Sequence, residues 1–196
     1  MTLFLWDWDN TLVPTQYLRN RCIIPFSREM LTPEEIEVLH QIETHLLELL
    51  DMALTLGRVY IVTNAEVGWV PFFVQQFVPK LEPLLQQFTI ISAKAKYERM
   101  YPDKDTLWKT RVFQDILNEQ FFLVQLIGFG DLDSDWISWH QAFNSRSVQH
   151  KFFQMVMNPN LTDLRDELEL LLKSLPHIVE SPRNGRHQIC KWKKSH

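Results

Sequence analysis

The chain opens on an apolar stretch that ends in two aspartates one residue apart: Leu3-Phe4-Leu5-Trp6-Asp7-Trp8-Asp9-Asn10-Thr11-Leu12. The apolar run predicts a buried strand, in which an unpaired carboxylate would cost more free energy than packing returns. At the carboxyl end of a strand, however, two carboxylates lie on the edge at which open α/β sheets bind ligands. The pair therefore indicates a site that holds a hard cation beside a nucleophile.

Length and composition are those of one ordinary globular domain. Of the 196 residues, 45% are apolar and 22% are charged, and the formal net charge of −4 argues against nucleic acid as a partner. The two cysteines, Cys22 and Cys190, form no disulfide framework and fit a reducing compartment. No apolar run approaches the ~18 residues of a membrane span, and the N-terminus lacks the features of a signal peptide. We therefore expect a soluble, cytoplasmic protein.

Apolar periodicity predicts strands that alternate with helices. Thr32-Pro33-Glu34-Glu35 is a strong helix start, because threonine can cap, proline suits the first helical position and Glu35 can complete a capping box. Gly57 is expected to end this helix. Such alternation predicts a parallel sheet with helices on both faces. Strands are expected at the opening run and at 58–62, 88–92, 122–127 and 152–157, and helices at 32–56, 66–78, 106–118, 136–144 and 162–175.

The connecting segments are expected to be less regular. Residues 1–178 should form the domain, with 13–31 as a flap or loop insertion and 93–105 as a polar irregular segment. The run Gly128-Phe129-Gly130-Asp131 is expected to break the fourth strand. Residues 179–196 carry several basic residues and are expected to form a flexible tail, which could contact an anionic membrane or an acidic partner, or remain solvated.

Three of the expected strands end in polar groups, and all three ends are carboxyl ends. The first ends in Asp7 and Asp9. The second ends in Thr63, whose hydroxyl is followed at once by backbone amides at a helix start, an arrangement that suits an oxyanion. The fourth is followed by an acidic cluster on a glycine turn, Gly130-Asp131-Leu132-Asp133-Ser134-Asp135. Because the carboxyl ends of parallel strands share one edge, we expect these distant segments to form one site.

The acidic clusters at this edge indicate a bound cation. The two clusters would repel one another unless a cation lay between them. Oxygen ligands with no histidine or cysteine nearby favour Mg²⁺ over zinc. A magnesium ion beside a free carboxylate and anion-binding amides is an arrangement for phosphoryl transfer.

In their order and placement, these residues resemble the four motifs of haloacid dehalogenase-like phosphatases. The resemblance covers about residues 3–157 and rests on Asp7-Trp8-Asp9-Asn10-Thr11, Thr63, a lysine, and Gly130-Asp131 with Asp135. It is consistent with a Rossmann-like parallel sheet of five strands in the order 5-4-1-2-3.

The resemblance implies a role for each of these residues. Asp7 would be the nucleophile that forms an aspartyl-phosphate, and Asp9 would protonate the leaving oxygen and then activate the hydrolytic water. Asp131 would complete a Mg²⁺ shell with Asp7 and the backbone carbonyl of Asp9. The phosphoryl group would be held by three further residues: Thr63, Asn64 and the backbone of Trp8.

The family also uses a lysine that neutralises the phosphoryl group and the nucleophile. Four lysines lie between the third and fourth expected strands: Lys94, Lys96, Lys104 and Lys109. We predict Lys109, which lies in the opening turn of the helix that feeds the fourth strand, with Lys104 as the alternative. Asp135 would orient this lysine by hydrogen bonding.

Three other residues invite different interpretations. His40 and His45 in one helix could ligate a metal, but no third ligand is placed for them, so ordinary helix positions are favoured. Cys22 has no visible base and is not expected to be a nucleophile.

A catalytically silent interaction module remains an alternative to the enzyme, although both aspartates of the first motif are intact.

Family members often carry a cap domain over the site, and neither usual insertion place has room for one here. An open site cannot surround a small metabolite unaided, but it admits a phosphorylated side chain of a macromolecule. We therefore expect a protein phosphatase that prefers phosphotyrosine slightly over phosphoserine or phosphothreonine. Its rim is expected to include the 13–31 flap, Trp69, Trp108 and Trp136.

Other substrates remain open at this point. One alternative is a small-molecule phosphatase, such as a nucleotidase, whose cap comes from a second subunit. The chain also resembles capless effector phosphatases that pathogenic bacteria deliver into host cells, which would place it in the host-cell cytoplasm. The oligomeric state is left open.

Overall fold

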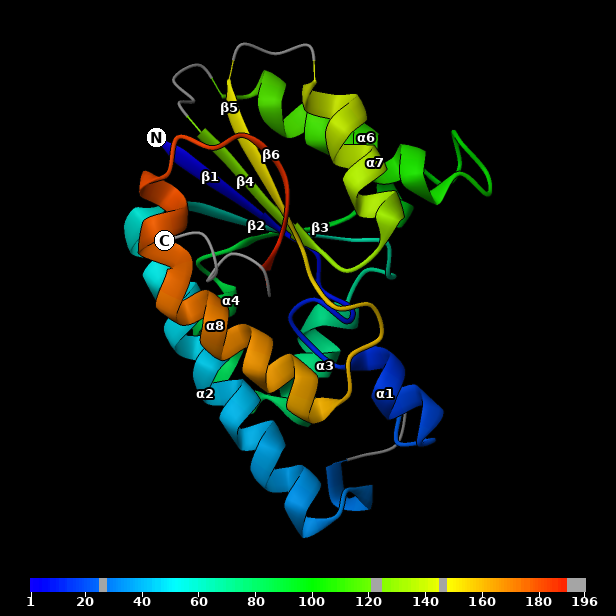
Figure 1. The fold of residues 1–196 in the computed structure, drawn as a ribbon. Helices are drawn as coiled ribbons and strands as arrows, with labels where there is room; N and C mark the ends of the chain where they lie inside the picture. The colour runs from blue at the N-terminus through cyan, green and yellow to red at the C-terminus, as the bar shows by residue number, and fades with distance from the viewer. Residues whose placement is uncertain (25–27, 121–124, 145–147, 190–196) are drawn as a thin grey trace.

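The computed structural model has an α/β fold built on one parallel sheet (Figure 1), as the alternation of strands and helices predicts. It describes residues 1–24, 28–120, 125–144 and 148–189. The sheet has six strands in the order β3-β2-β1-β4-β5-β6. These strands are β1 (Thr2–Trp6), β2 (Gly57–Thr63), β3 (Thr89–Ser92), β4 (Gln125–Gly130), β5 (Gln149–Gln154) and β6 (Gly185–Gln188).

Helices cover both faces of this sheet. The long helices α2 and α8 lie side by side on one face, and α6 and α7 lie on the other (Figure 1). No helix in the described residues is both long and apolar enough to cross a lipid bilayer. The helices are α1 (Thr15–Asn20), α2 (Pro33–Leu56), α3 (Trp69–Phe77), α4 (Glu82–Leu85), α5 (Ala93–Tyr97), α6 (Asp105–Asn118), α7 (Asp133–Phe143) and α8 (Leu161–Glu180), with 3₁₀ turns at Arg28–Met30 and Pro79–Leu81.

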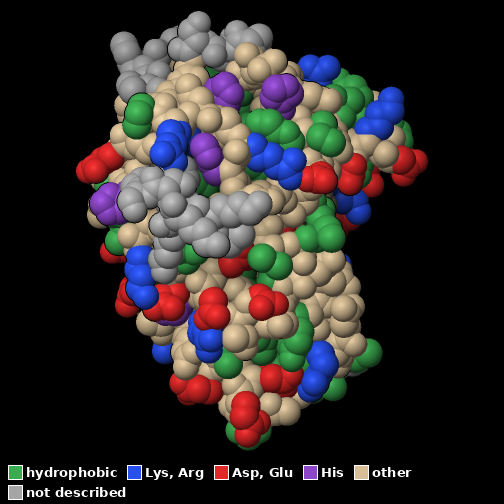
Figure 2. Space-filling model, in the orientation of Figure 1, with side chains coloured by type: hydrophobic (Ala, Val, Ile, Leu, Met, Phe, Trp, Pro, Cys, Tyr) green, Lys and Arg blue, Asp and Glu red, His purple; other side chains and the backbone are tan. Residues whose placement is uncertain are grey.

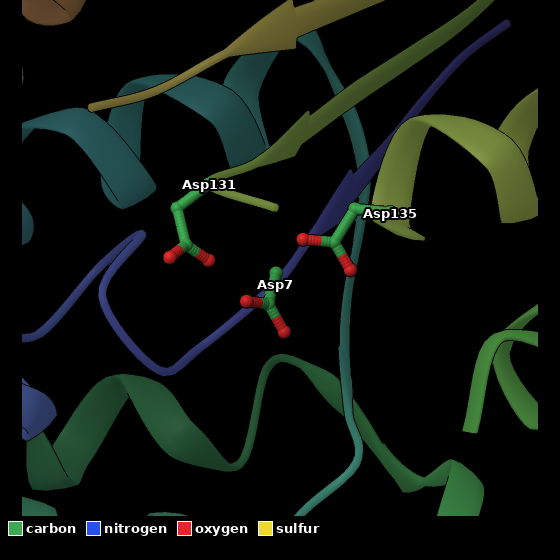
Figure 3. Close-up of side chains that lie close together, drawn as sticks. All are labelled: Asp7, Asp131 and Asp135. Atoms are coloured by element: carbon green, nitrogen blue, oxygen red, sulfur yellow. The ribbon is translucent and has the colours of Figure 1, made fainter. Parts of the chain in front are cut away.

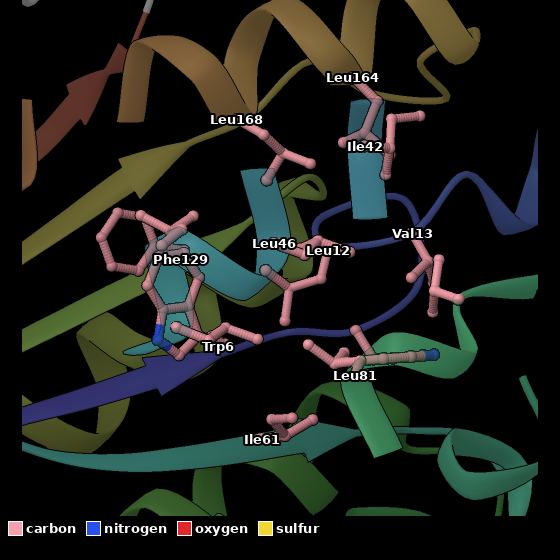
Figure 4. Close-up of a cluster of buried hydrophobic side chains, with 14 of the residues drawn as sticks. Trp6, Leu12, Val13, Ile42, Leu46, Ile61, Leu81, Phe129, Leu164 and Leu168 are labelled. Carbon is pink, nitrogen blue, oxygen red and sulfur yellow. The ribbon is translucent and has the colours of Figure 1, made fainter. Parts of the chain in front are cut away.

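The central strand β1 is apolar on both sides because both of its faces are covered. Phe4 and Trp6 point into the core beneath α2 and α8, whereas Leu3 and Leu5 point into the core beneath α6 and α7. The Trp6 indole stacks on Phe129 of β4, with ring centroids 3.8 Å apart (Figure 4). The continuous apolar run before Asp7 therefore reflects burial from two sides.

Helix α2 begins as the sequence predicts. The Thr32 hydroxyl accepts the Glu35 N–H at 3.2 Å, and the Glu35 carboxylate accepts the Thr32 N–H at 2.8 Å, so the capping box is formed. Gly57 closes the helix. The outer faces of α2 and α8 are charged, and Figure 2 shows acidic side chains gathered over these helices on the lower half of the molecule, among a few basic ones.

The expected order of the first five strands is found, but the prediction of a five-stranded sheet is wrong. Within the segment 179–196, which was expected to be a flexible tail, Gly185–Gln188 forms β6 and pairs in parallel with β5. Its sequence has no apolar alternation, so composition alone does not reveal it. The strand covers the edge of β5, and Ile189 after it is buried in the core. Arg186 of this strand pairs with Asp133, and residues 190–196 lie outside the described residues.

The sequence predicts that the glycines after residue 127 break the fourth strand, and this prediction is wrong. β4 runs through Gly128 and ends at Gly130, while 121–124 of the predicted strand lie outside the described residues. A Cβ atom at Gly128 would lie 2.3 Å from the Trp139 ring, and one at Gly130 would lie 2.7 Å from Asp135. Both glycines are therefore required by the close approach of α7 to the strand.

The fifth strand begins three residues earlier than predicted, at polar residues whose side chains bind carbonyl groups at the end of α8. Lys151 donates to the Ile178 carbonyl, and Gln149 Nε2 donates to the Ser181 carbonyl at 2.9 Å. Gln125 of β4 similarly donates to the Val179 carbonyl at 2.9 Å. The last carbonyls of a helix have no partners within it, so these side chains complete the hydrogen bonding of α8.

The segments expected to be irregular contain short helices. α1 lies within 13–31 and α5 lies within 93–105. α7 begins at Asp133, three residues before its predicted start, because the Asp135 carboxylate accepts the Leu132 N–H at 3.1 Å and stabilises an earlier first turn. α8 extends past its predicted end to Glu180, and Ile178 in the extension is buried.

Glu167 of α8 fixes the loop that follows β5. Its carboxylate accepts the Val156 N–H at 2.9 Å, and the residue is only 7% exposed. Burial raises the pKa of Glu167 to about 7. No cation pairs with this carboxylate in the described part of the chain.

Replacing Glu167 by glutamine should stabilise the protein at pH 8 but not at pH 4.5. The carboxyl group titrates near 7 when folded and near 4.5 when unfolded, so the folded state binds the extra proton between these values. Wild-type stability therefore falls as the pH rises through that window. One pKa unit corresponds to about 1.4 kcal/mol, so at pH 8 the free energy of unfolding of Glu167→Gln should exceed that of wild type by up to roughly 3 kcal/mol.

Urea unfolding at the two pH values measures this difference. The exposed variant Glu48→Gln on α2 is the control and should show no such pH dependence. The same stability difference between Glu167→Gln and wild type at both pH values would contradict the prediction.

Candidate functional site

A cavity of about 400 Å³ opens at the carboxyl ends of β1, β2 and β4. Asp7 follows β1 directly, Thr63 is the last residue of β2, and Asp131 follows the last residue of β4. Because these strands are parallel neighbours, three distant segments meet at one edge, as predicted. The cavity is lined by Asp7, Asp9, Asn10, Arg19, Thr63, Asn64, Ala65, Glu66, Trp69, Lys94, Lys109, Asp131, Leu132 and Asp135.

A buried lysine joins two of the aspartates. Lys109 Nζ lies 2.6 Å from Asp7 Oδ1 and 2.6 Å from Asp135 Oδ1, and the three side chains are at most 9% exposed. Lys109 comes from α6 and Asp135 from the first turn of α7. Of the two candidate lysines, the structure thus brings Lys109 to Asp7, whereas Lys104 is exposed and does not line the cavity.

The charges of this cluster shift the pKa values of its members. Burial raises the pKa of Asp7 well above its usual range, and the Asp135, Asp131 and Asp9 carboxylates add to this rise while Lys109 opposes it. Burial acts to lower the pKa of Lys109, but the Asp135 and Asp7 carboxylates outweigh it and raise that pKa. Burial and the Asp135 charge raise the pKa of Asp131 to about 7. The cluster therefore holds more negative charge than Lys109 neutralises.

Three of these carboxylates could hold a metal ion. Asp7, Asp131 and Asp135 point toward one another from two strand ends and one helix (Figure 3), and ligand oxygens of all three lie within 4.8 Å of one another. Both oxygens of Asp135 already accept hydrogen bonds, from Lys109 and from the Leu132 N–H.

Asp131 and Asp7 are better placed than Asp135 to bind the ion. Asp131 Oδ2 is buried without a hydrogen-bond partner in the described residues, and Asp7 Oδ2 has only a long contact of 3.4 Å from the Thr11 hydroxyl. The Asp9 carbonyl accepts no backbone hydrogen bond within the same residues. An orphaned buried oxygen among excess carboxylates fits a hard cation, because the ion would repay the desolvation cost.

Asp9 lies in different surroundings from Asp7. Its Oδ1 accepts hydrogen bonds from the Thr15 hydroxyl at 2.6 Å and from the Trp69 indole N–H at 2.8 Å. Its Oδ2 accepts one from the Thr63 hydroxyl at 3.2 Å. Three neutral donors thus fix this carboxylate at the wall of the cavity.

Sequence reasoning did not anticipate the contacts of Thr15 and Trp69 with Asp9. Thr15 lies in a segment without periodicity, and no local pattern distinguishes it. Trp69 was expected only as a rim aromatic, although its place just after β2 was a signal that it lies near the carboxyl edge. Thr63 was expected to hold phosphoryl oxygens. In the structure its hydroxyl donates to the Asp9 carboxylate and accepts a hydrogen bond from the Ala65 N–H at 3.0 Å.

The turn after Asp9 is formed by backbone contacts. Trp8 has a fully buried ring, and its carbonyl accepts the N–H groups of Leu12 at 3.0 Å and Val13 at 3.2 Å. Asn10 adopts a left-handed φ of 59°, which asparagine tolerates, and its side chain accepts the Gln16 N–H at 2.8 Å. Asn64 also lines the cavity, and its Oδ1 is buried without a partner in the described residues.

Several candidates lie away from the cavity. Trp108 is buried, and its indole N–H donates to the Tyr101 carbonyl at 2.6 Å. Trp136 packs against Phe152. Neither tryptophan lines the cavity, so the prediction that both are rim residues is wrong. Lys94 lines the cavity, whereas Lys96 pairs with Asp115. His40 and His45 are on α2, and Cys22 is exposed. None of these last three belongs to the group of possible metal ligands in the described residues.

Comparisons of the chain with protein-family models, with curated proteins and with solved structures found no significant match. What the site can do is therefore inferred from its geometry and chemistry.

Millimolar Mg²⁺ should raise the melting temperature of the protein by roughly 5 °C, because a ligand that binds only the folded state stabilises it. Asp131→Asn should remove most of this shift, since it replaces the carboxylate that has a free buried oxygen. Differential scanning fluorimetry in MgCl₂, compared with NaCl of equal ionic strength, measures the effect. Asp133→Asn alters an exposed neighbouring aspartate and should keep the full shift. A shift of equal size in all three proteins would contradict the assignment.

Proposed function

We propose that this chain is a Mg²⁺-dependent phosphomonoesterase of the haloacid dehalogenase-like kind. The observation that carries the proposal is the contact of Asp7 with Lys109 beside Asp131, whose buried oxygen has no partner in the described residues. A carboxylate next to both an ammonium group and a candidate cation site can attack an anionic phosphoryl group that would otherwise repel it.

In this proposal Asp7 attacks the phosphorus atom and forms an aspartyl-phosphate, while the bond from phosphorus to the leaving oxygen breaks. Lys109 neutralises charge on the attacking carboxylate and on the phosphoryl oxygens, and Asp135 keeps the ammonium in place. A bound Mg²⁺, held by Asp7, Asp131 and the Asp9 carbonyl, would supply further positive charge for the transferring group. Thr63 and Asn64 line the side of the cavity where the phosphoryl oxygens would lie.

Asp9 is suited to move protons in both steps. In the first it donates a proton to the leaving oxygen, and in the second it accepts one from the water that attacks the aspartyl-phosphate. Water attack releases inorganic phosphate and restores Asp7. The contacts from Thr15, Trp69 and Thr63 hold the Asp9 carboxyl in one orientation for both transfers.

The open cavity supports a macromolecular substrate. A cap domain would be inserted between β1 and α2 or between β3 and α6. The described residues of these two connections form only short helices and turns, and no further domain covers the cavity there. Leu132 at the cavity wall is 40% exposed, and Val67, next to the lining residue Glu66, is 77% exposed. Apolar groups beside an open site suit contact with a protein surface, and Trp69 suits an aromatic phosphoresidue. We therefore propose a phosphoprotein substrate, with phosphotyrosine preferred.

Asp7→Asn should lower the turnover of p-nitrophenyl phosphate in Mg²⁺ by at least about 10³-fold, because the amide cannot form the covalent intermediate. Asp51→Asn makes the same exchange at an exposed position of α2 and should retain wild-type kcat. Melting temperatures show whether each variant is folded. Turnover by wild type that persists in Asp7→Asn would overturn the assignment of the nucleophile.

A substrate panel should separate the remaining functions. We expect kcat/KM for phosphotyrosine peptides to exceed that for matched phosphoserine peptides and for nucleoside monophosphates by about tenfold. A higher kcat/KM for nucleotides, especially one that rises with protein concentration as a second subunit supplies a cap, would favour a small-molecule phosphatase. Binding of Mg²⁺ and of a phosphopeptide without turnover of any substrate would favour an interaction module.

A further inference from the structure

Arg19 is the cation that the candidate site leaves unused. Three basic side chains line the cavity: Lys109, Lys94 and Arg19. Lys109 is paired with Asp7 and Asp135, and Lys94 lies 2.6 Å from the Glu66 carboxylate. Within the described residues, no carboxylate lies within ion-pair distance of the Arg19 guanidinium. Its charge is therefore available to a bound molecule.

Helix α1 holds Arg19 toward the site. Thr15 and Arg19 are four residues apart and lie on one face of the helix, and the Thr15 hydroxyl donates to Asp9. Leu18 between them is fully buried, and the Gln16 N–H is bound to the Asn10 side chain. The arginine is exposed, but hydrogen bonds hold the helix that carries it to Asp9 and Asn10 in the turn after β1.

Trp69 connects Arg19 to the leaving-group side of the site. The Arg19 guanidinium lies over the Trp69 ring, 5.3 Å from its centroid, and the same indole donates its N–H to Asp9. In the proposed mechanism Asp9 protonates the leaving oxygen. One indole ring therefore separates this proton donor from the Arg19 guanidinium, which lies on the side of the cavity where the leaving group would be in that mechanism.

We propose that Arg19 binds a second negative charge on the substrate, namely an acidic side chain that flanks the phosphorylated residue. The inference rests on the proposed phosphoprotein phosphatase activity. A guanidinium that lies over an aromatic ring can still donate its N–H groups to a carboxylate, which it can bind with two parallel hydrogen bonds. The open cavity admits the residues on either side of the phosphorylated one. Arg19 would thus select acidic target sequences.

Two phosphopeptides that differ only in the flanking residues test this role. One carries glutamate on both sides of the phosphorylated residue, and the other carries glutamine. We expect wild type to hydrolyse the glutamate peptide with a kcat/KM roughly fivefold higher, mainly through KM, and this preference should shrink as salt is added. Arg19→Gln should bring the ratio close to one.

Arg21→Gln is the matched control. Arg21 is near Arg19 in the sequence but pairs with Glu35 at 3.3 Å and does not line the cavity, so this variant should keep the preference. Melting temperatures establish that both variants fold. Because Arg19 is exposed, its replacement should leave the melting temperature close to that of wild type.

Other outcomes would overturn the inference in distinguishable ways. Equal hydrolysis of the two peptides by wild type would remove the second-charge role while leaving the phosphatase activity standing. A loss in Arg19→Gln by the same factor for both peptides would show that Arg19 acts only by supporting Trp69 and Asp9. A strong preference for a nucleoside diphosphate over both peptides would assign the guanidinium to a second phosphate instead. Failure of wild type to hydrolyse even p-nitrophenyl phosphate would contradict the proposed function itself.

Discussion

One buried ammonium group organises the carboxyl edge of the sheet. Lys109 Nζ lies 2.6 Å from an oxygen of Asp7 and 2.6 Å from an oxygen of Asp135, and the three side chains are almost fully buried at the floor of the open cavity. Removing one member of such a network leaves an uncompensated buried charge, which costs several kcal/mol. Because its members come from the end of β1, from α6 and from α7, the network also links both helices to the end of the central strand. Gly130 allows the close approach of Asp135 that completes it.

This network separates two aspartates that are almost adjacent in the chain. Asp7 is buried against a cation, whereas Asp9 accepts hydrogen bonds from the neutral side chains of Thr15, Thr63 and Trp69. A carboxylate beside a cation suits attack on an anionic phosphoryl group, and one fixed by neutral donors at a cavity wall suits proton transfer. The proposed division of labour rests on these surroundings, and the role proposed for Arg19 would extend it to the part of a substrate beyond the leaving oxygen.

Sequence patterns predicted a helix or strand best where the contacts that form it lie within a few residues of one another. The capping box at Thr32 and Glu35 forms because both partners lie within one turn of α2. The same local reasoning fails for Gly128, which suggests a strand break but serves the packing of Trp139 against β4. It also fails for Gly185–Gln188, where pairing with the edge of β5 makes a strand that has no apolar pattern of its own.

The sequence by itself determined the parallel α/β sheet and the convergence of Asp7, Thr63 and Asp131, because strand alternation and the polarity of strand ends are local features with one topological consequence. Only the tertiary structure decided that Lys109 reaches Asp7 while Lys104 does not, and that Thr15 and Trp69 bind Asp9. It also decided that Arg19 lies over the Trp69 ring. These contacts depend on how helices pack onto the sheet, and side chains far apart in the sequence carry no local signal of their final distance.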